Sequence, residues 1–74
     1  MTYTTTLPDG KIATKNSKTR AFTFATAVRF GGGDWAVYGW ATSEKTTRSQ
    51  ISEARRNNAW QGGFEAVVLP AKLA

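Results

Sequence analysis

A β-hairpin with large apolar side chains on both faces is the strongest structural pattern in this chain, and it spans residues 21–42. Two runs rich in aromatic and β-branched residues flank residues 31–34, Gly-Gly-Gly-Asp, which read as the connecting loop. The first run alternates between bulky and small side chains with the period of two that a strand requires. One face of the hairpin must cover a core, and the other face needs a separate explanation.

The position of the loop predicts which residues of the two strands lie opposite each other. The expected pairs are Phe30 with Trp35, Val28 with Val37, Thr26 with Gly39 and Phe24 with Ala41 on one face, and Ala27 with Tyr38 and Ala25 with Trp40 on the other. A slip of one residue within the three glycines would exchange these partners.

The length of the chain and the residue types that it lacks limit both fold and chemistry. With 74 residues, we expect a single small domain over residues 1–74. The chain has no cysteine and no histidine. This excludes a disulfide framework and removes the commonest general base and zinc ligand. We expect the aromatic residues, or association with another chain, to supply the stability.

The segment before the main hairpin predicts a smaller hairpin at the edge of the sheet. Residues 3–7 and 11–15 have strand character, and Pro8-Asp9-Gly10 is a turn in which proline presets φ and glycine accepts a positive φ. Its expected apolar anchors are Tyr3, Leu7 and Ile12. Residues 16–20 are polar and predict a loop.

One helix is predicted to begin after Ser43, a favourable N-cap that Glu44 follows in the first turn. The expected buried stripe is thin and consists of Thr47, Ile51, Ala54 and Asn58, with Ala59 or Trp60 extending the contact. Such a helix must lie on the sheet to be stable. Gly62-Gly63 is expected to end it as a glycine cap.

Residues 64–69 predict a last strand that is apolar on both faces and that Pro70 closes. The pattern places it inside the sheet or under cover, and leaves open whether it pairs in parallel or at an edge. The order β-β-β-β-α-β predicts an α+β domain, in which one helix packs on one face of a mainly antiparallel sheet.

The charge balance favours a polyanionic partner. Ten lysines and arginines against five acids give a net charge of +5, which is typical of many nucleic-acid-binding proteins. Tyr38 and Trp40, beside Arg29 on one sheet face, would form a stacking platform for unpaired bases. The other candidate nucleic-acid-binding residues are Lys18, Arg20, Arg48, Arg55 and Arg56.

A second hypothesis is a protein-interaction surface. The helix can cover only one hairpin face, and if it covers Tyr38 and Trp40, another aromatic set is left exposed. That set is Phe22, Phe24, Phe30 and Trp35. Its size would predict a homodimer or a complex with another protein, which would be a host protein if the resemblance described below holds. The sequence leaves both hypotheses open.

No residues suggest catalysis. The five acids are each explained by a turn, a helix cap, a polar helix face or a strand, and no spacing suggests a metal site or a cofactor. The glycines at 31–33 precede a strand instead of a helix, so they predict a hairpin loop and not a phosphate-binding loop. We therefore expect a non-enzymatic binding protein.

Four features of the chain resemble those of a group of phage proteins. They are the run Leu7-Pro8-Asp9-Gly10, the basic residues 17–20 before an aromatic strand, the segment Trp35 to Trp40 and the basic helix. The chain resembles small uncharacterised proteins encoded by actinobacterial phages. This resemblance implies an accessory protein that acts in the cytoplasm of a bacterial host. Residues 1–7 lack the pattern of a secretory signal, and nothing resembles a transmembrane span, so a cytoplasmic protein without membrane contact is expected.

Overall fold

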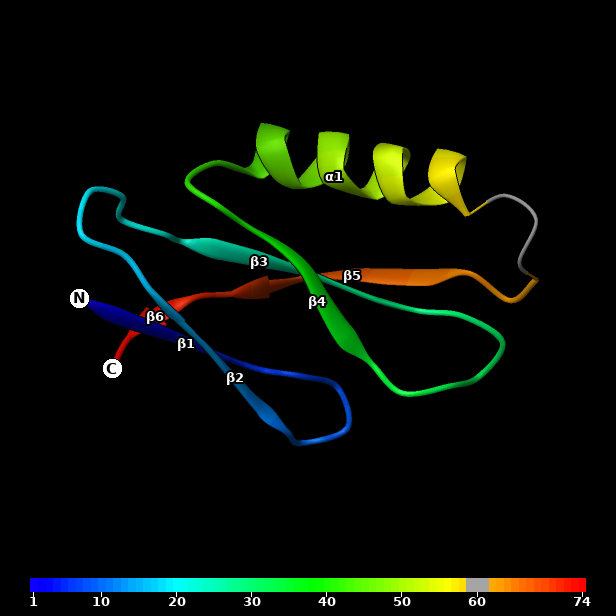
Figure 1. The fold of residues 1–74 in the computed structure, drawn as a ribbon, viewed down its shortest axis with the longest axis horizontal. Helices are drawn as coiled ribbons and strands as arrows, with labels where there is room; N and C mark the ends of the chain where they lie inside the picture. The colour runs from blue at the N-terminus through cyan, green and yellow to red at the C-terminus, as the bar shows by residue number, and fades with distance from the viewer. Residues whose placement is uncertain (59–61) are drawn as a thin grey trace.

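Six strands and one helix make up the fold in the computed structural model, which describes residues 1–58 and 62–74 (Figure 1). In chain order the elements are β1 (Thr2–Thr6), β2 (Ile12–Asn16), β3 (Phe24–Arg29), β4 (Ala36–Ala41), α1 (Glu44–Asn57), β5 (Glu65–Pro70) and β6 (Lys72–Leu73). Within the described residues, the strands form two three-stranded antiparallel sheets. The predicted α+β fold is confirmed, with a short sixth strand added to the predicted order.

β3 lies at the centre of the larger sheet, between β4 and β5. The predicted pairing with β4 holds at Thr26 and Gly39, but Ala27 then pairs with Val37 instead of Tyr38. Tyr38 is therefore the extra residue of a β-bulge, which shifts the register by one position. The predicted partners before the bulge are confirmed, whereas after it Val28 pairs with Ala36 and not with the predicted Val37.

β5 pairs antiparallel with the other side of β3, over the range from Phe24 with Pro70 to Arg29 with Glu65. It is thus an edge strand, so the predicted place inside the sheet is wrong, while pairing at an edge is one of the two alternatives that the sequence left open. After β5 the chain continues into β6, and the backbone N–H of Ala71 donates to the Thr23 carbonyl at 2.9 Å. Because β6 pairs with β1, this segment connects the two sheets.

The predicted place of the first hairpin at the edge of the main sheet is wrong, because β1 and β2 pair with β6 in a separate, smaller sheet of the order β2-β1-β6. The predicted turn of this hairpin is confirmed, because the Gly10 N–H donates to the Leu7 carbonyl at 2.9 Å and Gly10 has a φ of 92°. Tyr3 and Leu7 are buried as predicted, but Ile12 is 69% exposed. The predicted role of Ile12 as an anchor is wrong because Ile12 pairs with the exposed Thr6 on the outward side of an edge strand.

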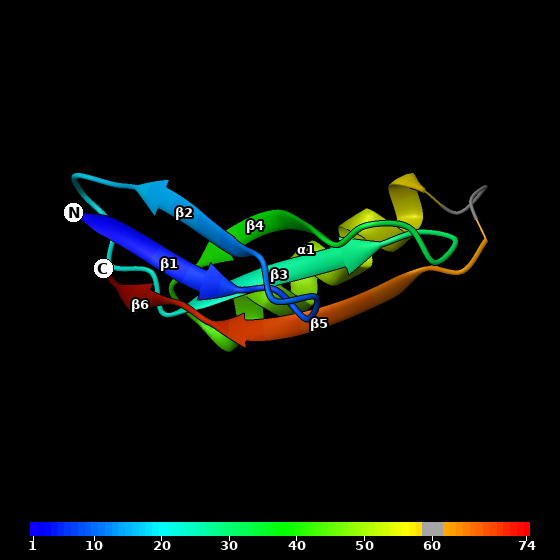
Figure 2. The same ribbon diagram turned by 90° about the horizontal axis from the view of Figure 1, so that it is seen from below.

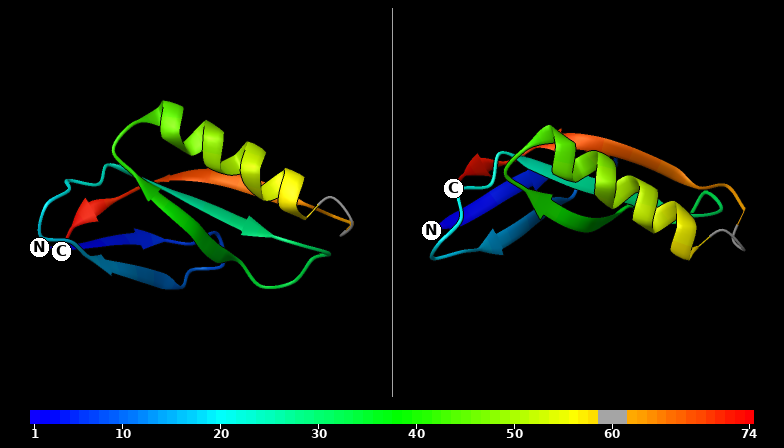
Figure 3. Two further views of the ribbon diagram at one scale, coloured as in Figure 1. Left: turned by 45° about the horizontal axis from the view of Figure 1, so that its top comes forward. Right: turned by 90° about the horizontal axis from the view of Figure 1, so that it is seen from above.

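The elements form three layers, with α1 on one side of the larger sheet and the smaller sheet on the other (Figures 1 and 2). Thr26 Oγ1 donates to Gln50 Oε1 at 2.7 Å, so α1 covers the β3 face that carries Thr26 (Figure 3). On the opposite face, Ala25 and Ala27 are fully buried. The expectation that an external partner must cover the second hairpin face is therefore wrong here, because the first hairpin folds over it.

The start of α1 and its buried stripe are confirmed. Ser43 has extended backbone angles, and its Oγ accepts a hydrogen bond from the Thr46 N–H at 3.4 Å. Thr47 and Ala54 are fully buried against the sheet, and Ile51 is half-buried. The small residues of the stripe let the helix approach the sheet closely.

α1 ends earlier than predicted, at Asn57, and the C-cap is Asn58, whose backbone N–H and side-chain Nδ2 both donate to the Ala54 carbonyl. The predicted glycine cap at 62–63 is therefore wrong. The predicted contacts of residues 59–60 lie outside the described residues. The glycine run after β3 forms the predicted hairpin loop, in which Gly31 has a φ of 59°.

Candidate nucleic-acid interface

Most of the basic side chains have no carboxylate partner within the described residues. Four of the five acids bond within the chain: Asp9 to the Lys11 N–H, Glu44 to Arg48, Glu53 to Tyr38 and Glu65 to Arg29. Within residues 1–58 and 62–74, only Arg29 and Arg48 form ion pairs. The basic side chains without a carboxylate in reach there are Lys11, Lys15, Lys18, Arg20, Lys45, Arg55, Arg56 and Lys72.

The outer side of α1 gathers three of the cations in one groove. Lys45, Arg48 and Arg56 line an open pocket of about 430 Å³ together with Ser49, Ser52 and Glu53. We call these six residues the helix groove. The spacing of 45, 48, 52 and 56 follows the helical repeat, so the side chains form one stripe roughly 16 Å long. Cations and hydroxyls in a stripe of this kind suit a row of phosphate groups.

Glu53, the one acid that lines the helix groove, is held by a residue of the sheet. The Tyr38 hydroxyl donates to Glu53 Oε1 at 3.0 Å. Burial raises the pKa of the Tyr38 phenol, and the hydrogen bond to Glu53 raises it further. The carboxylate is thereby drawn toward β4, and the bulge at Tyr38 explains why this side chain reaches α1.

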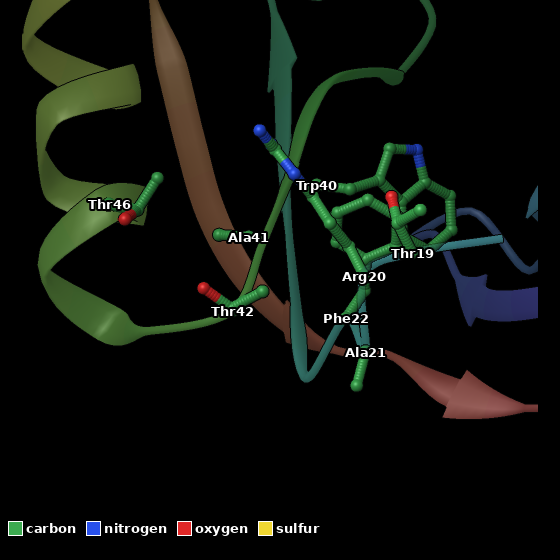
Figure 4. Close-up of a pocket in the computed structure, with 8 residues that line it drawn as sticks. All are labelled: Thr19, Arg20, Ala21, Phe22, Trp40, Ala41, Thr42 and Thr46. Atoms are coloured by element: carbon green, nitrogen blue, oxygen red, sulfur yellow. The ribbon is translucent and has the colours of Figure 1, made fainter. Parts of the chain in front are cut away.

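A second pocket, of about 490 Å³, lies between the loop before β3 and the end of β4 (Figure 4). Arg20, Phe22 and Trp40 lie on one side of it, while Thr42 and Thr46 lie on the other. We call it the Trp40 pocket, and no carboxylate lines it. The centroid of the Trp40 ring lies 6.1 Å from that of the Phe22 ring, so Phe22 packs against the indole.

The predicted stacking platform of Arg29, Tyr38 and Trp40 does not form. Tyr38 turns to α1, whereas Trp40 lies against Phe22 on the side of the smaller sheet. Arg29 is engaged elsewhere: its side chain is ion-paired with Glu65. The bulge causes this separation, because it moves Tyr38 out of the alternation that the sequence suggested.

Arg29, at the end of β3, contacts Trp35 just before β4 and Glu65 at the start of β5. Its guanidinium carbon lies 4.9 Å from the centroid of the Trp35 ring on one side, and Glu65 lies on the other. The hydrogen bond from Arg29 lowers the pKa of the Glu65 carboxyl and raises the pKa of Arg29 itself. This neutralised pair is a poor phosphate ligand.

The other basic residues that were predicted to bind nucleic acid lie in different parts of the structure. Arg48 and Arg56 lie in the helix groove, whereas the Arg55 guanidinium lies 5.4 Å from the centroid of the Phe64 ring. Lys18 is exposed on the loop before β3, and the Arg20 backbone N–H donates to Ser17 Oγ at 3.1 Å. This bond shapes the loop that carries Arg20 to the Trp40 pocket.

The aromatic set predicted for a protein interface is dispersed. Phe22 is buried, with its ring 5.6 Å from Tyr3 by centroids. Phe24 and Phe30 are half-buried, and Trp35 lies beneath Arg29. Phe22 departs from the predicted alternation because β3 begins only at Phe24. These four side chains do not form one apolar patch.

The sequence analysis missed two contributions to these sites. Lys45 was not among the candidates, although its spacing of three and eleven residues from Arg48 and Arg56 was a usable signal. The hydroxyls of Thr42 and Thr46 had no sequence signal, because the fold alone places them beside Trp40.

Comparison with protein-family models, with curated proteins and with solved structures finds no match. The described part of the chain contains no cluster of three or more potential metal ligands. Among residues 1–58 and 62–74, no helix has both the length and the apolar character needed to cross a membrane. The helix groove and the Trp40 pocket are therefore the candidate binding sites.

Proposed function

We propose that this protein binds nucleic acid, without catalysis, through the helix groove on the outer side of α1. The observation that carries this proposal is the alignment of Lys45, Arg48 and Arg56 along one open face, with hydroxyls between them. Each strand of a duplex carries one phosphate per roughly 3.4 Å of helix axis, so a stripe of this length meets several phosphates. Serine hydroxyls between cations add hydrogen bonds to phosphate oxygens.

The distribution of charge supports a polyanion over an acidic protein surface. The acids of the chain are mostly bonded to other residues of the chain, and Glu53, which lines the groove, accepts a hydrogen bond from Tyr38. The net charge of +5 therefore acts as a surface field that attracts polyanions. The proposal is limited to binding, because the chain has no histidine or cysteine to serve as base or nucleophile.

The experiment is fluorescence anisotropy with labelled 20-nucleotide single-stranded and duplex DNA at low salt. We expect binding by the unmodified protein and a large loss of affinity in the variant K45A/R48A/R56A. The matched control is K11A/K15A/K72A, which removes the same charge from the smaller sheet. An equal loss in both variants would show that net charge alone is responsible, and absence of binding by the unmodified protein would refute the proposal.

A further inference from the structure

The Trp40 pocket combines three chemical features that a phosphate-binding groove does not need. It presents an indole ring, a guanidinium group and hydroxyl groups around one hollow. Its volume of about 490 Å³ is within the usual range for small-ligand sites, roughly 300 to 1,000 Å³. The pocket therefore suits a ligand that has both a flat ring and a negative charge.

The ring of this pocket is held in place by other rings. Trp40 is half-buried, and its ring packs against the ring of Phe22, with the centroids 6.1 Å apart and the ring planes tilted by 49°. Phe22 in turn meets the edge of Tyr3, a buried residue of β1. A braced indole loses little conformational entropy when a second ring stacks on it.

The cation of the pocket is free for an anionic ligand. Arg20 is exposed, and no carboxylate of the described residues lies within 4 Å of its guanidinium group. The hydrogen bond from its backbone to Ser17 fixes the loop while leaving the side chain available. Arginine offers several donors in a planar array that matches phosphate oxygens.

The pocket and the helix groove both include a residue of the first turn of α1. Thr46 lines the pocket, and Lys45, the next residue on the first turn of α1, lines the groove. A nucleic-acid strand whose phosphates follow the groove therefore reaches the pocket at the helix N-terminus. A base within a duplex must be unstacked and unpaired before it can turn into such a pocket, so an unpaired base enters it at a lower energetic cost.

We infer that the Trp40 pocket receives an unpaired base of single-stranded nucleic acid, which stacks on Trp40 while Arg20 binds the adjacent phosphate. This inference rests on the proposed function and adds the form of the ligand. It assigns phosphate binding to the helix groove and base binding to the pocket, so the two parts can be tested separately.

The test uses the full chain and three probes: a 12-nucleotide oligothymidylate, an abasic 12-mer with the same phosphates, and a 12-base-pair duplex. In the variant W35F/W60F, Trp40 is the only fluorophore of its kind, and we expect oligothymidylate to quench it. Stacking on one ring corresponds to a roughly 5- to 150-fold change in affinity, so we expect W40A to weaken oligothymidylate binding by that factor. Binding of the abasic probe should not change.

Three further variants distinguish a loss of base binding from a loss of folding. W40F keeps a ring and should retain most of the affinity, whereas R20A alters only an exposed loop side chain and should weaken oligothymidylate binding. W35A, which removes an indole outside the pocket, is the matched control and should bind as the unmodified protein does. Circular dichroism reports whether each variant is folded.

The outcomes separate this inference from the proposed function. If the unmodified protein binds oligothymidylate and the abasic probe equally, or binds the duplex most tightly, the pocket does not receive a base and only the groove proposal survives. If W40A and R20A, both folded, leave oligothymidylate affinity unchanged, the inference is likewise overturned. If none of the three probes binds at low salt, the proposed function fails as well.

Discussion

The hydroxyl of Tyr38 lies 3.0 Å from Glu53 Oε1, and this bond links the bulge of β4 to the outer side of α1. It fastens the helix to the sheet and draws the one acid of the helix groove toward β4. A structural irregularity in a strand thereby affects the electrostatics of a surface on the neighbouring helix.

Glu53→Gln should lower the pKa of Tyr38 toward its ordinary value of 10.0, because the amide is a weaker acceptor and carries no charge. Part of the elevation should remain, since burial is its larger cause. Because the pKa is raised in the folded state, this hydrogen bond stabilises the fold below the unfolded pKa, and its contribution is lost as pH rises through the folded value. Ultraviolet titration of the phenol in a Tyr3→Phe background, which leaves Tyr38 as the only tyrosine, measures the shift.

Glu65→Gln should remove the pH dependence of the folding stability that the ion pair between Arg29 and Glu65 causes. The hydrogen bond from Arg29 lowers the pKa of Glu65 below its ordinary value of 4.5. The pair therefore stabilises the fold above the unfolded pKa, and its contribution is lost as pH falls through the folded value. Thermal unfolding at pH 7 and at pH 3 should show a smaller difference for E65Q than for the unmodified protein. Glu44→Gln, which affects an exposed pair at 3.9 Å, is the control and should behave as the unmodified protein.

Thr26→Val should destabilise the protein by about 1 to 3 kcal/mol. Thr26 is fully buried, and valine of similar shape leaves Gln50 Oε1 without the hydroxyl donor at the helix–sheet contact. Urea unfolding provides the free energy. The same substitution at the exposed Thr14 of β2 should change it by no more than about 0.5 kcal/mol. Equal effects at the two positions would argue against the buried hydrogen bond.

Gly39→Ala should cost about 1 to 3 kcal/mol of stability, because an added Cβ would lie 2.6 Å from Gln50 Nε2. Gln50 would have to move away, and its bonds to Thr26 and to the Trp40 carbonyl would be weakened. The double variant G39A/Q50A should be less unstable than the sum of the two single variants. Gly62→Ala, which meets no atom within 4 Å, is the control and should be close to neutral. Strict additivity would contradict this account of the contact.

The parts of the fold that local chemistry determines were predictable from the sequence. Ser43 caps α1, and Thr47 and Ala54 form its buried stripe, because caps and helical spacing involve residues near one another in the chain. The exact end of the helix was not predictable, since Asn58 caps it before the glycines are reached. Helix ends depend on competition among several weak signals.

The arrangement that brings the candidate site together depends on contacts between distant segments. The bulge at Tyr38 inserts a single residue into the pairing; the three glycines indicated that the register could shift by one residue, but not that the shift would occur at Tyr38. Four of the five residues of β1 are threonine, so the role of the first hairpin in covering Ala25 and Ala27 was not evident. The Trp40 pocket follows from both features. The charge of the helix face could be predicted, and the position of Trp40 beside Arg20 could not.

The salt dependence of binding distinguishes phosphate contacts in the helix groove from a general effect of net charge. Each phosphate contact contributes about 0.7 to 0.9 to the slope of log K against log salt concentration. We expect the slope for single-stranded DNA to fall by about 2 in K45A/R48A/R56A, because three contacts are removed from the helix groove. The slope for K11A/K15A/K72A, with the same net charge, should stay close to that of the unmodified protein. Identical slopes for the two triple variants would contradict the claim that the outer side of α1 is the nucleic-acid interface.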